Sequence, residues 1–156
     1  MKRHAILYIL VCTLLMVSCN SYEKDKQIKA DLTIKAKEDV NFAGVNFTVK
    51  NLDVKIWGNC PTYKSKMAIL QKLGTIHVIK HIDDQLAIGP LYLGQDHDLK
   101  LLADSLLAKH PESWAVITDQ NVILKGNVKE KQLPKLLEAI HQQIPERALI
   151  NQTTVN

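Results

Sequence analysis

Two stretches decide the fold: DVKIWGNC at Asp53–Cys60 and NVILKGNV at Asn121–Val128. Each alternates apolar side chains up to a glycine, which is typical of a half-buried strand, and each is followed by a pattern with helical spacing. When the two stretches are aligned, Phe47 falls over Ala115 at the same offset. The sequence therefore predicts an internal duplication.

The duplicated unit has the order helix, strand, strand, helix, strand. In the first copy the apolar periodicity predicts these elements over residues 28–40, 45–49, 54–56, 63–74 and 75–82. In the second copy it predicts them over residues 99–107, 115–117, 122–124, 133–144 and 148–155. We therefore predict an α+β fold made of two tandem αββαβ units.

The N-terminus has the pattern of a lipoprotein signal peptide. Lys2 and Arg3 precede an apolar run over residues 5–18, which is short for a membrane-spanning helix. The run ends in LMVSC at residues 15–19, which resembles a lipobox with Cys19 as the acceptor of the lipid. We predict that residues 1–18 are removed and that Cys19 is acylated. A plain signal peptide, or a short membrane anchor with an incidental cysteine, is the alternative.

Acylation would place the protein on a membrane rather than through it. Each buried methylene of an acyl chain contributes about 0.8 kcal/mol, so several chains anchor a protein almost permanently. The sequence after Cys19 contains no second apolar run of spanning length. Asn20 follows the cysteine, where aspartate would favour inner-membrane retention in enterobacteria, so we expect outer-membrane attachment facing the periplasm.

Charge and cysteine content exclude several classes of protein. Removing Lys2 and Arg3 from the 20 basic residues leaves 18 against 16 acidic ones, or +2, which does not suggest a nucleic-acid-binding protein. Cys60 is the one thiol left after cleavage and acylation, so an internal disulfide is excluded.

The predicted division of the chain is a signal peptide (residues 1–18), a polar tether (19–27), a first unit (28–83), a linker (84–95) and a second unit (96–156). A unit of about 60 residues buries only about 60% of its unfolded surface and is marginal alone. We therefore expect the units to pack on each other or on a partner, through linker residues such as Leu86 and Ile88.

The repeat resembles the BON domain (bacterial OsmY and nodulation domain). The resemblance lies in an apolar-x-Gly-x-apolar motif between a hairpin and a helix, IWGNC at residues 56–60 and LKGNV at residues 124–128. It implies a three-stranded mixed sheet with two helices on one face in each unit. It also implies a non-catalytic envelope protein that binds anionic phospholipid and supports envelope integrity. Gly58 and Gly126 are expected at structural turns that need a left-handed backbone or a close approach.

Other candidate sites have structural interpretations. Cys60 aligns with Val128, which indicates a core position rather than a reactive thiol. His77 and His81 would lie roughly 13 Å apart on a strand, too far for a shared metal ion. Asp96 and Asp98 fit a helix N-terminus. No catalytic triad, CxxC or phosphate-loop motif is present, so the sequence predicts no enzyme, no cofactor and no metal site.

The predicted membrane-contact site is the first helix of the second unit. The resemblance implies that this helix faces lipid, and here the face opposite its leucine stripe carries the candidate contacts Lys100, Leu101, Ala108 and Lys109. The lysines of the first unit are a second candidate surface for anionic lipid. The predicted partners are therefore the membrane, anionic phospholipid and envelope proteins. The alternative function is an adaptor that docks envelope machinery without lipid specificity.

Overall fold

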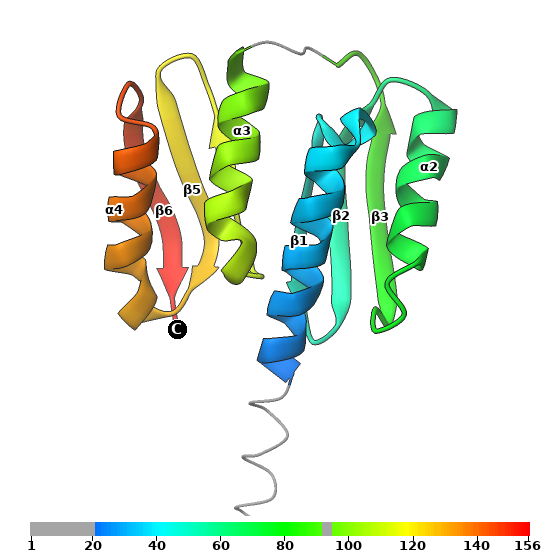
Figure 1. Ribbon diagram of the computed structural model, residues 1–156, viewed down its shortest axis with the longest axis horizontal. Coiled ribbons are helices and arrows are strands. Elements are labelled where there is room, and N and C mark those ends of the chain that lie inside the picture. Colours follow the sequence, from blue (N-terminus) through cyan, green and yellow to red (C-terminus); the bar gives the residue numbers. More distant parts are fainter. Residues whose placement is uncertain (1–20, 92–94) are drawn as a thin grey trace, which may run out of the picture.

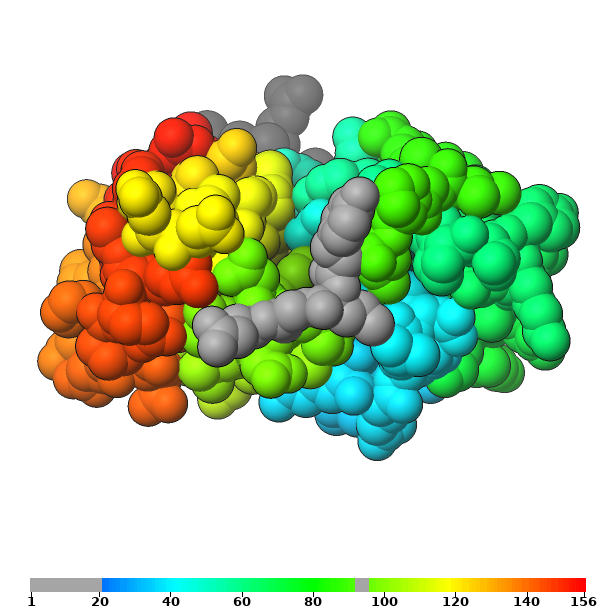
Figure 2. Space-filling model, turned by 90° about the horizontal axis from the view of Figure 1, so that it is seen from above, coloured from blue at the N-terminus to red at the C-terminus, as the bar shows by residue number. Residues whose placement is uncertain are grey.

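The computed structural model describes residues 21–91 and 95–156 and shows two αββαβ units side by side (Figures 1 and 2). The first unit contains the N-terminal helix, described over residues 21–38, then β1 (Val45–Lys50), β2 (Asp53–Cys60), α2 (Tyr63–Gly74) and β3 (His81–Ile88). The second contains α3 (Gln95–Leu106), β4 (Ser113–Ile117), β5 (Asn121–Val128), α4 (Leu133–Gln143) and β6 (Ala148–Val155). Short 3-10 turns lie at Val40–Phe42, Leu107–Lys109 and Glu130–Gln132. The predicted fold class is confirmed.

Each unit has a mixed sheet with the same topology. β2 pairs antiparallel with β1 and parallel with β3, and β5 pairs in the same way with β4 and β6. The helices of both units cover one face of the sheets and leave the other face uncovered (Figure 1). The two sheets are separate, so the halves do not merge into one continuous sheet.

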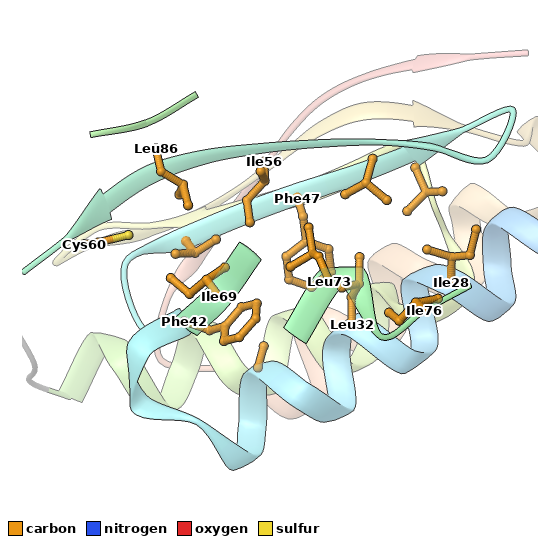
Figure 3. Close-up of a cluster of buried hydrophobic side chains, with 14 residues drawn as sticks. Ile28, Leu32, Phe42, Phe47, Ile56, Cys60, Ile69, Leu73, Ile76 and Leu86 are labelled. Atoms are coloured by element: carbon orange, nitrogen blue, oxygen red, sulfur yellow. The ribbon is translucent and has the colours of Figure 1, made fainter. Parts of the chain in front are cut away.

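Each unit has its own hydrophobic core between its sheet and its helices. In the first unit, the side chains of Ile28 and Leu32 on the N-terminal helix pack with Phe47, Ile56 and others (Figure 3). The buried members of this cluster lie between Ile28 and Leu86, and those of the second cluster lie between Ala103 and Ile144. Removing the first 19 residues therefore leaves both cores complete.

The repeated glycines lie within strands rather than at the turns that the sequence predicts, and both have a positive φ. Gly58 has φ 122° and Gly126 has φ 96°, and both lie within the central strand of their sheet. A Cβ atom at Gly58 would overlap the backbone carbonyl of Gly44, and one at Gly126 would overlap that of Glu112. These close approaches let the next N–H groups, of Asn59 and Asn127, donate to the same two carbonyls at 3.1 Å.

The predicted third strand over residues 75–82 is wrong. Residues 75–80 form turns after α2, and β3 runs from His81 to Ile88, where Leu86 is buried in the core. The reason is topological: a parallel β3 must begin beside the start of β2, and His81 pairs there with Asp53. The first sheet thus extends through residues 84–88, the first part of the segment 84–95 that we predicted to be linker.

The predicted start of the first helix is also too late. Residues 21–27, expected to be tether, are helical. Val40, expected on the buried helical stripe, is 60% exposed in a 3-10 turn, because the helix ends at residue 38. Asp25 holds the first part of this helix in place. Its carboxylate accepts hydrogen bonds from the N–H groups of Asn51 and Leu52, in the turn between β1 and β2, at 2.8 and 2.7 Å.

Within residues 21–91 and 95–156, the helices are all too short or too polar to cross a membrane.

Candidate functional site

The two units meet where the edge strands β1 and β4 lie against each other, and we call this contact the seam. The backbone N–H of Val49 donates to the carbonyl of Pro111 at 2.9 Å. Beside it, Lys50 forms an ion pair with Glu112 at 2.9 Å. The expectation that the units pack on each other is confirmed, but the contact uses strand edges rather than the linker residue Leu86, which lies in the first core.

The uncovered face of the sheets carries an aromatic pair at the seam. The rings of Trp57 in β2 and Trp114 in β4 meet edge to face, with centroids 5.1 Å apart and planes at 84°. This geometry is favourable for aromatic rings beyond the area that it buries. The pair joins the two units on the side away from the helices.

A buried lysine lies on the helix side of the seam. The Nζ atom of Lys29 donates to the carbonyl of Phe47 at 2.6 Å and to that of Ser113 at 3.1 Å, so it bridges the two units. It also lies 4.3 Å from the centroid of the Phe47 ring. Lys29 is 1% exposed. Burial lowers its pKa to about 7; the charge of Asp104 acts against this shift and that of Lys100 adds to it.

Other polar groups of the second unit face this lysine. On α3, Lys100 and Asp104 form an ion pair at 2.6 Å, and both side chains are largely buried. His110, which precedes the buried Pro111, has a buried Nδ1 atom with no hydrogen-bond partner among the described residues. Its pKa lies below the usual value, first because of burial and then because of the charges of Lys26, Lys109 and Lys29.

A pocket of about 450 Å³, which we call the Tyr22 pocket, opens at one end of the seam. Tyr22 on the N-terminal helix forms one wall, and the second unit provides the other lining residues: Pro111, Glu112, Asn127, Lys129, Glu130, Lys131, Gln132 and Asn156. Figure 1 places the start of the N-terminal helix and the C-terminus at the same end of the molecule. The pocket therefore exists only while the units are joined.

Two lysines and two glutamates line the pocket: Lys129, Lys131, Glu112 and Glu130. Lys129 lies 3.6 Å from the centroid of the Tyr22 ring, and Lys26 lies 5.6 Å from it. Lys26 forms an ion pair with Glu23 at 2.6 Å. Among the residues that the structure describes, neither Lys129 nor Lys131 has a carboxylate within 4 Å.

The four predicted membrane-contact residues do not form one exposed basic face. Lys100 turns inward to Asp104 and has 16% of its side chain exposed. Leu101 and Ala108 are half-buried, and Lys109 is exposed at the end of the 3-10 turn after α3. Cys19, the predicted lipid attachment site, lies outside the described residues.

The remaining predicted sites have local structural roles or none. Cys60 is fully buried in the first core. His77 lies in the turns before β3 and His81 begins that strand, and both are exposed. Asp96 lies in the first turn of α3 and pairs with Arg147 at 3.1 Å. No group of three metal-ligating side chains occurs in residues 21–91 and 95–156.

Sequence reasoning missed the residues that the structure brings together here. Lys29 follows a core residue, and its burial depends on the second unit, so helical periodicity gives no signal for it. Tyr22 was the available signal, as an aromatic residue in a polar segment that the sequence predicts to be tether. Lys129 and Lys131 directly follow the second glycine motif, but only the fold places them against Tyr22.

No protein-family model matches the chain, and no curated protein matches it. Two solved structures of CdsD, a structural protein of the type III secretion system of Chlamydia trachomatis, are similar to it. One has a TM-score of 0.36 and 10% identity, with 81% of this chain and 90% of that chain covered. The other, a C-terminal domain, has a TM-score of 0.35 and 13% identity, with 79% and 62% covered. These likenesses are distant, so the residues of this chain have to carry any functional proposal.

Proposed function

We propose that this chain is a membrane-anchored, non-catalytic protein of the bacterial envelope, a tandem pair of BON-like units that binds anionic phospholipid and supports envelope integrity. The observation that carries the proposal is the position of Lys129 over Tyr22, with Lys131 in the same pocket. Tyr22 is three residues from Cys19, which is roughly 10 Å of extended chain at most. Acylation of Cys19 would therefore hold these ammonium groups at the lipid headgroups.

At this end, Lys129 and Lys131 can contact an anionic surface, beside the carboxylate of Glu130. A lysine near such a surface contributes about 1 kcal/mol, and the contribution falls off within a Debye length. The exposed Lys109 and the half-buried Leu101 and Ala108 of the α3 region provide a second, amphipathic contact. Lys100 contributes little to it, because its charge is paired with Asp104.

Vesicle flotation tests the proposal. The protein from residue 20 onward, which keeps both cores and lacks the acyl chains, should float with vesicles that contain phosphatidylserine and not with pure phosphatidylcholine. Replacing both Lys129 and Lys131 by glutamine should weaken binding by about 2 kcal/mol, or roughly 30-fold. Raising the salt concentration should also weaken binding.

A matched control removes two charges elsewhere. Lys64 and Lys135 are exposed on α2 and α4, and replacing both by glutamine should change binding much less. Leu101→Glu tests the α3 contact separately. Binding that is indifferent to lipid charge would refute the proposal.

An adaptor function is the second candidate. It is favoured by the uncovered sheet face, where the Trp57–Trp114 pair joins the units and Ile150 is 38% exposed. An adaptor would keep its envelope partner after Lys129 and Lys131 are replaced, and would lose it on Trp57→Ser.

A further inference from the structure

We propose that the seam is a proton-sensitive latch: protonation of Lys29 and His110 separates the two units and thereby takes apart the Tyr22 pocket. This inference rests on the proposed function, because it assigns the regulation of the same surface. Lys29 is the one side chain whose donated hydrogen bonds reach a carbonyl in each unit, Phe47 and Ser113, among the described residues.

The seam is polar where a permanent interface would be apolar. Its helix side contains Lys29, His110 and the Lys100–Asp104 pair, and no carboxylate lies within 4 Å of the Lys29 Nζ atom in the described chain. The positive charge of Lys26, on the same helix as Lys29, lowers the pKa of His110. Since Lys100 and Asp104 nearly cancel, protons added at Lys29 and His110 leave an uncompensated charge in a buried contact, which is strongly unfavourable.

The direction of the pH effect follows from Lys29. In the joined state its pKa is about 7, and in the separated state, where water reaches it, its pKa returns toward the ordinary value of about 10.4. Between these values the separated state binds more protons, so a fall in pH favours separation. For Lys29 alone, the equilibrium constant for separation changes about tenfold per pH unit between these two pKa values. Below the lower value Lys29 adds no further change.

His110 extends the effect to lower pH. Its pKa is depressed in the joined state, by burial first and by three lysines after it. The separated state therefore takes up this proton first as the pH falls through the ordinary histidine range. Both groups act in the same direction, so acid opens the seam and base closes it.

Opening the seam dismantles the candidate site. One wall of the Tyr22 pocket belongs to the N-terminal helix and the others belong to the second unit. Separation would lift Lys129 from the Tyr22 ring and break the Lys50–Glu112 pair.

Distance measurement by pulsed electron paramagnetic resonance tests the latch without lipid, so its outcome does not depend on whether lipid binds. Spin labels at Lys64→Cys and Lys135→Cys report the separation of α2 and α4 in the protein from residue 20 onward, where Cys60 is buried and unlabelled. We expect a longer-distance population that grows as the pH falls from 9 to 6, by about tenfold per unit above pH 7.

Two variants assign the effect to Lys29. Lys29→Met keeps an unbranched side chain without a charge, and should remove the pH dependence above 7. Lys29→Arg stays charged and should keep the units separated at pH 9. Lys37→Met, at an exposed position on the same helix, is the control and should behave like the unchanged protein.

A measurement on the unchanged chain covers the case in which a variant fails to fold. The ¹³Cε resonance of Lys29 should titrate near neutral pH in the joined state. Distances that do not change between pH 6 and 9, or titration of Lys29 in the ordinary lysine range, would overturn the proposal.

Discussion

The two units have the same backbone topology and differ in the side chains that fill their cores. Gly58 and Gly126 both have a positive φ within their central strand, and each lies opposite the first residue of its edge strand. The position filled by Phe47 in the first core is filled by Ala115 in the second, although both are buried beside the central strand. The fold therefore requires the glycine at this position in both units. The size of a core side chain can differ between the units, because its neighbours in the same core compensate for the difference in volume.

The largest loss of stability is expected from Phe47→Ala. The change gives the first unit the side chain of the second at this position, but leaves a cavity because the neighbours in the first core stay the same. Phenylalanine-to-alanine changes in cores cost about 3–5 kcal/mol, so we expect a loss in that range. The free energy of unfolding from urea denaturation, followed by tryptophan fluorescence, measures it.

The reciprocal change is the control for that prediction. Ala115→Phe overfills the second core and should cost about 1–3 kcal/mol through displaced neighbours. If both changes were neutral, the cores would be loosely packed and the comparison would lose its basis.

Alanine at the repeated glycines should cost about 3 kcal/mol, and nearly the same in each unit. The reason is common to both: a left-handed backbone at Gly58 and Gly126, and a carbonyl group where the new Cβ would lie. Gly74→Ala is the matched control, because Gly74 is helical, a methyl group there would meet nothing within 4 Å, and the change should stabilise the protein slightly. Unequal losses at Gly58 and Gly126 would mean that the two positions are not equivalent.

The similarity of the two units also determines which parts of the fold could be predicted from the sequence. The central strands repeat the same apolar alternation and the same glycine, so the two units could be predicted from local pattern. The end of the first unit could not be predicted in this way. Residues 75–82 are rich in β-branched side chains, which favours a strand there, but the parallel pairing of His81 with Asp53 determines where β3 begins.

The candidate site was less predictable than the fold. Its residues come from the N-terminal helix and the segment after β5, and Lys29 is buried only because the second unit covers it. Contacts between units leave no periodic signal in either segment. The sequence alone does supply the position of Tyr22 relative to Cys19, since the two residues are so close along the chain.

The smallest expected effect comes from replacing the last residue of the glycine motif in the first unit, Cys60, by the residue of the second unit. Cys60 and Val128 end the central strands, pair with Ile88 and Val155, and are both buried in their cores. Since valine fills this position in the second unit, Cys60→Val should change the free energy of unfolding by less than about 1.5 kcal/mol. Burial raises the pKa of the Cys60 thiol, so a thiol reagent should modify it at the rate of unfolding rather than directly. Rapid modification of the folded protein would show that the position is open in the first unit, and the equivalence of the two strand ends would then fail at the residue where the repeat is most regular.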